Sequence, residues 1–403
     1  MANGYRIVSG DSHLQLAAER WTPHIPARYQ DQAPRTVRMP NGTDATVMGI
    51  DGKPHMFKGA LVGMPYEDRS PNGGRFETAP GAGTAEQRLR EQDQDGIDAE
   101  ILFTAPEGVS FYHGIKDKEA FKATLHAWNE FLAEEYCAVA PDRLLGIGIL
   151  PDTGLQDAID EMEYCARVGL KGVALSQHPS GDDVSRPEDD RFWAAAIDLN
   201  MPLTAHVSFN PRGSTGPARY PYEYDLKEVS SGVDPFSKLN QYAVRGAGNA
   251  LQMVFGGVFD RFPSLRFYFA ETQIGWIPHF LDILDEQYDR TIHWAERLTG
   301  MKKLDRMPSE YIREHFSWGF MRNAFGVRVR HEIGVKNMMW ATDFPHAESE
   351  WPQSQDLIGE VFADVPEDER RQILGGNAIE FFHLDQAAPA GSGVRGAAAA
   401  DVS

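Results

Sequence analysis

Four apolar segments of strand length in this 403-residue chain each end on an acidic residue or a histidine. The clearest is the segment 338–342, which runs directly into Asp343 and is followed three residues later by His346. A buried carboxylate without a cation or hydrogen-bond donors costs several kcal/mol, so Asp343 needs a partner. The other three segments are 5–10, followed by Asp11 and His13; 202–205, followed by His206; and 265–270, followed by Glu271. In a barrel of alternating strands and helices these ends meet at one mouth.

The rest of the chain shows the alternation of strands and helices that such a barrel requires. Strand patterns alternate with helical patterns, and short loops join them, which favours a parallel sheet. We therefore expect a distorted α/β (β/α)8 TIM barrel in one domain, residues 1–385, with two long lid insertions after the first and fifth strands, about 14–92 and 208–239. The Ala/Gly-rich tail, 386–403, is expected to be disordered. Further strands are expected at 99–103, 144–150, 172–175, 315–319 and 337–342, and helices at 84–95, 119–140, 155–168, 189–199, 241–259, 276–298, 324–333, 355–362 and 367–382.

The charge and cysteine content limit the kinds of partner and the cellular location that this chain is expected to have. Lys plus Arg number 39 against 59 Asp plus Glu, a net charge of −20, which argues against nucleic acid or an anionic membrane as a partner. The chain shows neither an apolar signal region nor an apolar run of membrane-spanning length. Cys137 and Cys165 form no disulfide framework or ligand spacing. We expect a cytoplasmic protein without disulfides.

The residues at the strand ends have the chemistry of a metal site. Asp11 and His13 are separated by one residue, so on extended chain both side chains point to the same face. Two imidazoles with carboxylates suit one divalent cation such as zinc or manganese, with positions left open for water or substrate. A hydrogen-bonded core histidine is the ordinary explanation for His13 or His206 alone, but their joint placement favours the metal site. Glu271 is explained equally well as a site residue or as a structural ion pair. His346 and Trp351 fit substrate or supporting contacts and fit packing about as well.

Five short motifs together resemble the amidohydrolase-related family of metal-dependent TIM-barrel enzymes, in the branch with aminocarboxymuconate semialdehyde, resorcylate and carboxyvanillate decarboxylases. The motifs are Asp11-Ser12-His13, Thr204-Ala205-His206, 259–263 before Ala270-Glu271, 341–346 and 374–378. The resemblance implies that Asp11 and His13 are the metal pair of the first strand. It also implies that His206 and Asp343 are the ligands of the fifth and eighth strands.

The chain departs from that family at one position. Several relatives carry a histidine at the end of the sixth strand that activates water or positions substrate, whereas this chain has Glu271. His279, in the following helix, is a less direct substitute. Three roles therefore remain open for Glu271: a further metal ligand, a proton carrier or a substrate contact.

The predicted function is non-oxidative decarboxylation of a small, aromatic or enolic carboxylic acid, with Asp343, Glu271 and His206 as catalytic residues. The alternative is hydrolysis of a lactone, ester, amide or carbon–carbon bond by a metal-bound hydroxide. A barrel that binds without catalysing is a minor alternative. Relatives suggest a homodimer.

Overall fold

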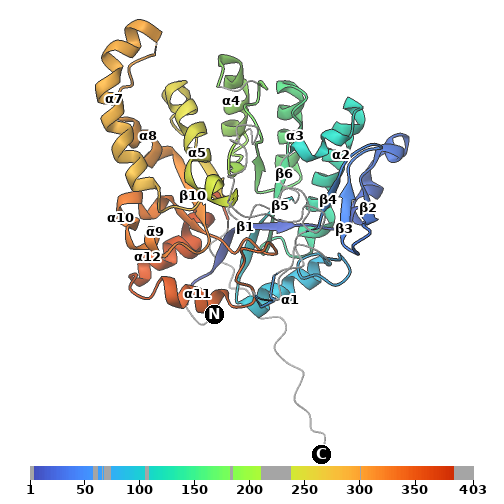
Figure 1. The fold of residues 1–403 in the computed structure, drawn as a ribbon. Helices are drawn as coiled ribbons and strands as arrows, with labels where there is room; N and C mark the ends of the chain where they lie inside the picture. Colours follow the sequence, from blue (N-terminus) through green and yellow to red (C-terminus); the bar gives the residue numbers. More distant parts are fainter. Residues whose placement is uncertain are drawn as a thin grey trace, which may run out of the picture.

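Eight parallel strands form the centre of the molecule (Figure 1). The computed structural model describes residues 4–57, 62–65, 67, 74–104, 109–181, 185–209, 237–299 and 301–384. Each neighbouring pair in the sheet is parallel, in the order β1-β5-β6-β7-β8-β9-β10-β11. The strands are β1 Val8–Leu14, β5 Ala99–Thr104, β6 Leu144–Ile149, β7 Gly172–Ala174, β8 Leu203–His206, β9 Phe267–Ala270, β10 Phe316–Phe320 and β11 Met338–Trp340.

The first and last strands meet and close the barrel. The backbone N–H of Asp343, just after β11, donates to the carbonyl of Asp11 in β1 at 3.0 Å. The N–H of His13 donates in turn to the carbonyl of Phe344 at 2.8 Å. These bonds bring the two ends of the sheet together, as the predicted TIM barrel requires. The prediction of the fold class is confirmed.

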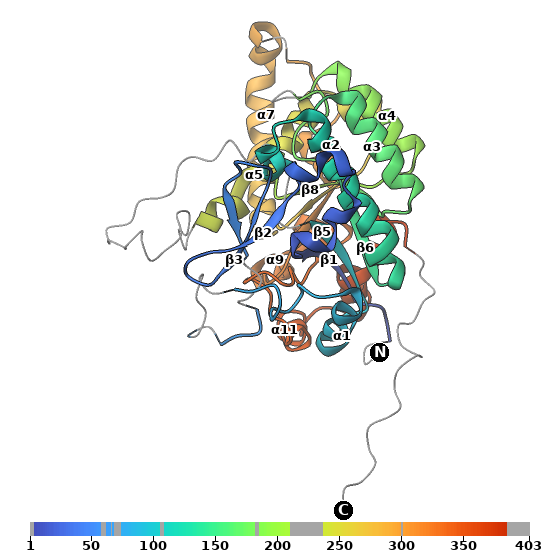
Figure 2. The ribbon, with the colours of Figure 1, turned by 90° about the vertical axis from the view of Figure 1, so that its right-hand side faces the viewer.

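Helices surround the strands in chain order (Figures 1 and 2). Capping residues mark the ends of helix α1. At its start the Thr84 hydroxyl accepts the Gln87 N–H at 3.3 Å, and at its end Gly96 adopts a left-handed conformation, with φ 71°. The helices are α1 Ala85–Asp95, α2 Lys118–Phe131, α3 Leu155–Arg167, α4 Asp190–Asp198, α5 Ser237–Phe255, α6 Val258–Arg261, α7 Ile277–Thr299, α8 Pro308–His315, α9 Ala324–Arg328, α10 Arg330–Ile333, α11 Ser354–Val361, α12 Glu367–Arg371 and α13 Asn377–Phe381.

The predicted helices differ from the observed ones at five places. The helix expected over 119–140 ends as α2 at Phe131 and continues as a π-helical turn, Leu132–Tyr136, and a 3-10 turn, Cys137–Val139. The helix expected over 324–333 is divided into α9 and α10. The helix expected over 241–259 begins at Ser237 and is divided into α5 and α6. The last expected helix contains a π-helical turn, Gln372–Gly376, between α12 and α13. Helix α8 was not predicted, because its eight residues carry a charged stretch and a very short apolar stripe.

The barrel strands are buried on both faces, which explains their nearly continuous apolar sequences. In β9, Phe267 and Phe269 pack outward against aromatic residues such as Trp318, whose ring stacks on Phe269 at 5.4 Å. Tyr268, between them in sequence, lies in a separate buried cluster with Met339. The outward cluster joins the strands to their helices, and the inner cluster fills the barrel below the mouth.

The first insertion is more regular than predicted. It contains a three-stranded antiparallel sheet of β2 Arg35–Arg38, β3 Asp44–Val47 and β4 Pro54–Met56. The sequence did not predict this sheet, because strands of three or four residues are too short to show a period in sequence. The ring of Trp21 packs edge to face on Trp128 of α2, with centroids 5.3 Å apart, and so joins this insertion to the barrel.

Two predicted features lie outside the described residues: most of the second insertion, 210–236, and the tail from 385 onward. Among the helices that the structure describes, none is long and apolar enough to cross a membrane.

Candidate metal centre

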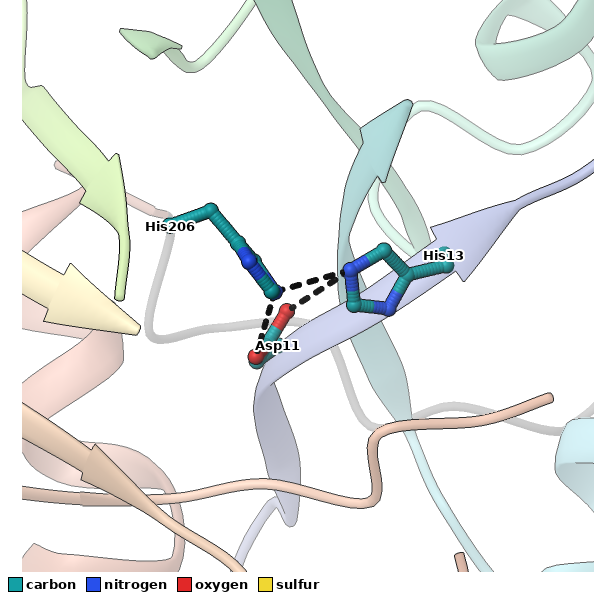
Figure 3. A group of neighbouring side chains, drawn as sticks. All are labelled: Asp11, His13 and His206. Carbon is teal, nitrogen blue, oxygen red and sulfur yellow. Dashed lines mark hydrogen bonds and ion pairs between the residues drawn. The ribbon is translucent and has the colours of Figure 1, made fainter. Parts of the chain in front are cut away.

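Asp11, His13 and His206 converge at the mouth of the barrel (Figure 3). Asp11 and His13 project from β1, and His206 is the last residue of β8. The two Nε2 atoms of the histidines are 3.0 Å apart. Asp11 Oδ1 lies 3.8 Å from His13 Nε2, and Asp11 Oδ2 lies 3.6 Å from His206 Nε2. Two strands that are far apart in sequence thus bring a carboxylate and two imidazoles to one point.

The surroundings of Asp11 fit a bound cation. Its side chain is fully buried, and neither carboxylate oxygen has a hydrogen-bond partner among the residues that the structure describes. A buried carboxylate in this state is costly unless a positive charge compensates it. Carboxylate and imidazole ligands are those that first-row divalent cations accept. The donor set and the unpartnered oxygens therefore match a divalent metal ion.

Asp343 and His346 lie on the other side of the His13 ring. Asp343 Oδ1 is 3.3 Å from His13 Nδ1 and 3.0 Å from His346 Nδ1. The His346 ring stacks on that of His13, with centroids 4.0 Å apart. Because Asp343 contacts Nδ1 of His13, the other ring nitrogen, Nε2, points toward Asp11 and His206. Carboxylates commonly orient metal-binding histidines in this way. The second oxygen of Asp343, Oδ2, has no hydrogen-bond partner among the described residues, and is the atom by which Asp343 would join the cation.

Burial and neighbouring charge act on both members of this pair. Burial and the nearby His346 lower the pKa of His13, which favours the neutral imidazole that a metal requires. Burial alone would raise the pKa of Asp343, but His346 and His13 together hold it below its ordinary value.

Glu271 stands next to the three converging residues. Its Oε2 is 3.5 Å from His206 Nε2, and its side chain is only 6% exposed. It follows β9 directly, at the position where the family resemblance led us to expect a histidine. The carboxylate is thus within reach of the same space as the His206 imidazole.

The backbone at three of these strand ends is unusual. Val207, Glu271 and Asp343 have φ values of 63°, 54° and 55°, in the left-handed region that L residues seldom adopt. For the β-branched Val207 this conformation is especially unfavourable. Hydrogen bonds between neighbouring ends hold it, including one from the Val207 N–H to the Ala270 carbonyl at 3.0 Å. Strain of this kind is typical of sites where side-chain direction matters more than local stability.

One of the residues predicted as substrate or supporting contacts, His279, lies away from the three converging side chains. His279 is exposed on α7, and among the described residues the structure gives it no contact with this group. The buried stripe of α7 is Ile277, Leu281, Leu284 and Tyr288. His279 is therefore on the opposite side of the helix from this stripe, and the structure does not bring it to the three converging residues.

Trp351 packs behind the turn that carries Asp343. Its ring is 5.2 Å from that of Phe344, and its indole N–H donates to the Glu91 carbonyl at 3.1 Å. These contacts are those of a supporting residue.

Sequence reasoning missed a buried ion pair next to the site, Arg88 on α1 and Glu100 on β5. Arg88 Nη1 donates to the His13 carbonyl at 3.0 Å. The Ser12 hydroxyl donates to Glu100 at 3.0 Å. Charged residues inside a helix and a strand were the available signal, but such residues are usually at the surface, and only the fold shows that these are buried.

Comparison with known proteins gives a consistent assignment. A family model described as amidohydrolase matches residues 11–384. The 2-amino-3-carboxymuconate-6-semialdehyde decarboxylase of Dictyostelium discoideum is 24% identical over 300 residues, covering 74% of this chain and 76% of that protein. The gamma-resorcylate decarboxylase of Rhodococcus jostii is 26% identical over 317 residues, covering 74% of this chain and 87% of that protein.

A solved structure shares the fold. The 5-carboxyvanillate decarboxylase of Novosphingobium aromaticivorans, complexed with manganese and 4-hydroxy-3-methoxy-5-nitrobenzoic acid, superposes with a TM-score of 0.62 at 18% identity, covering 95% of this chain and 97% of that one. The match confirms the predicted fold. The named relatives agree with the predicted class of enzyme, a carboxy-lyase.

Proposed function

Because the chain belongs to the amidohydrolase family, we propose that it is a divalent-metal-dependent, non-oxidative decarboxylase of a small aromatic or enolic carboxylic acid. The observation that carries this proposal is the buried Asp11 carboxylate, without hydrogen-bond partners among the described residues and facing the Nε2 atoms of His13 and His206. The decarboxylase relatives support the reaction type.

Asp11, His13 and His206 would hold the cation, with Asp343 joining through Oδ2. Zinc and manganese are the metals that these ligands suit best. When bound, the metal would polarise oxygen atoms of the substrate and stabilise the negative charge that develops on them.

Glu271 is the residue best placed to move the proton. The Oδ1 atom of Asp343 is already in contact with His13 and His346, whereas Glu271 lies at its strand end beside His206. We assign Glu271 to delivering a proton to the carbon that bears the carboxylate. The carbon–carbon bond then breaks, its electron pair restores the π system of the ring or enol, and carbon dioxide leaves. Glu271 recovers its proton from solvent.

We propose the two insertions as lids over this mouth. The described part of the first insertion reaches the turn after β11, where a Cβ on Gly81, with φ 73°, would lie 2.6 Å from a ring carbon of Pro345. A glycine is required for this approach. A segment packed this closely against the turn after β11 is able to exclude water from the site.

Three expectations on partners and location are retained as proposals. The first is that the protein forms a homodimer. A cytoplasmic location is supported by Cys137 and Cys165, which are buried free thiols. The net charge of −20 supports a small-molecule substrate over nucleic acid or anionic lipid.

Isotope labelling tests the reaction. The protein loaded with manganese or zinc is incubated with a panel of hydroxybenzoates and lactones, and carbon dioxide release is followed. In deuterium oxide, we expect one deuterium on the product carbon that lost its carboxylate. The metal-stripped protein is the control. Incorporation of oxygen-18 from water into a product carboxylate or hydroxyl, without carbon dioxide release, would contradict decarboxylation and support the hydrolase.

A further inference from the structure

Arg88 is a buried cation that touches both segments carrying the candidate ligands. It lies on α1 and is 1% exposed. Its Nη1 donates to the carbonyl of His13 at 3.0 Å, and its Nη2 donates to the carbonyl of Phe344 at 3.1 Å. The first carbonyl belongs to a candidate ligand at the end of β1. The second belongs to the residue that follows Asp343.

The Phe344 carbonyl is the point at which these segments are joined. It accepts the N–H of His13 at 2.8 Å as well as the Arg88 donor. The guanidinium also lies over the Phe344 ring, 4.4 Å from its centroid. A displacement of the turn after β11 would therefore break contacts with Arg88 and with His13 together.

Glu100 keeps this cation in place. Its two carboxylate oxygens accept from Arg88 Nε at 2.6 Å and Nη2 at 3.2 Å, and it also accepts from Gln92 at 2.7 Å. Burial alone would lower the pKa of Arg88, but Glu100 raises it above its ordinary value. The guanidinium is therefore charged. Its N–H donors are oriented by Glu100, which Gln92 in turn holds by a hydrogen bond.

We propose that Arg88, held by Glu100, is a positioning residue that sets the spacing between the Asp11–His13 strand and the Asp343–His346 turn. It acts through backbone carbonyls and does not touch substrate or metal. The inference rests on the proposed metal-dependent function. A planar guanidinium with five N–H donors satisfies these acceptors at once, whereas a lysine ammonium is a compact charge with three.

Cobalt(II) binding to the full-length, metal-stripped protein is the test. The dissociation constant is measured by competition with a chelator, and the ligand geometry is followed by the visible absorption of bound cobalt. Arg88→Lys is expected to bind cobalt about 10- to 100-fold more weakly than wild type, the range for groups that orient metal ligands, with a changed absorption spectrum.

Arg143→Lys is the matched control. Arg143 also joins carbonyls and a carboxylate, at 3.1 Å to Asp98 O and 2.8 Å to Asp93, but it precedes β6 and so lies at the other end of the barrel. We expect this variant to lose thermal stability while binding cobalt with the affinity and spectrum of wild type.

The outcomes separate the two proposals. If wild type binds no cobalt, the metal-dependent function fails. If wild type binds cobalt and Arg88→Lys binds it with the same affinity and spectrum, the role of Arg88 is overturned. It is also overturned if Arg143→Lys weakens cobalt binding as much as Arg88→Lys does. Should Arg88→Lys not fold, Gln92→Leu replaces it, since it removes one donor to Glu100 and leaves both charges. This variant should weaken cobalt binding several-fold, and wild-type affinity would overturn the proposal.

Discussion

The two sides of the candidate metal centre are built differently. On the β1–β11 side, side-chain hydroxyls join the strands: Thr342 Oγ1 lies 3.0 Å from Ser9 Oγ and 2.9 Å from Ser12 Oγ, and all three residues are buried. Arg88 and Glu100 lie directly behind them. Behind the candidate ligands, this side is closely packed and its strands are joined by hydrogen bonds.

The β8–β9 side is more open. The side chain of His206 is 12% exposed, against 0% for His13. The predicted second insertion begins two residues after His206. The β1–β11 side therefore holds three of the four candidate ligands, Asp11, His13 and Asp343, whereas the β8–β9 side holds His206 and the neighbouring Glu271.

The largest expected effect would come from the β1–β11 side. Asp11→Asn removes the buried charge that would bind the cation, so bound metal should fall from about one equivalent per chain to near zero. Loss of several kcal/mol of metal stabilisation implies a drop in turnover on the order of 10³-fold. Elemental analysis and initial rates measure both. Asp152→Asn, in a half-buried pair with His113 at 2.6 Å, is the control and should retain metal and activity. Full activity in Asp11→Asn would place the site elsewhere.

A change on the β8–β9 side should separate chemistry from metal binding. Glu271→Gln keeps the shape of the side chain but cannot donate a carboxylic acid proton, so kcat should fall by roughly 10²-fold, the lower end of the range for a lost general acid. Metal affinity should stay close to that of wild type, because Glu271 is not among the three converging residues. Glu161→Gln serves as the control, since Glu161 pairs with His126 at 2.9 Å away from the site. If Glu271→Gln loses its metal as completely as Asp11→Asn, the two sides do not differ in role.

The smallest effect on activity is expected at α1, the helix that packs behind the β1–β11 side. There a substitution should change the free energy of unfolding and leave turnover unchanged. Burial raises the pKa of Asp95, at the end of α1, from 3.8 to about 6, although its Oδ1 accepts the Ser354 N–H at 2.9 Å. The folded state therefore holds the proton more tightly than the unfolded state. This favourable contribution is complete below pH 4 and is lost as the pH rises through about 6.

Urea unfolding of wild type and Asp95→Asn at several pH values measures this contribution. The unfolding free energy of wild type minus that of the variant should decrease by up to about 3 kcal/mol between pH 4 and pH 7, with turnover unchanged. Asp93→Asn, at an exposed position of α1, is the control. A difference that does not vary with pH would show that the Asp95 carboxyl is not perturbed by burial.

The sequence predicted the barrel because its strands are buried on both faces and end on polar residues. It also located Asp11, His13 and His206, because the carboxyl ends of parallel strands meet at one mouth whatever the details of packing. The structure does not bring His279 to these residues, because proximity in sequence does not decide which side of a helix a residue occupies. The short strands β2, β3 and β4 failed because three or four residues carry no readable period.

The sequence alone determined which residue types reach the mouth, since strand length and polarity are local properties. Only the tertiary structure decided how they face one another. Asp343 contacts the Nδ1 atom of His13 and leaves Nε2 directed at Asp11, a choice that depends on the turn after β11 and on the left-handed conformation there. The pairing of Arg88 with Glu100 joins residues of a helix and a strand that packing brings together. Burial converts both from ordinary charged residues into parts of the site, and burial is a property of the whole fold.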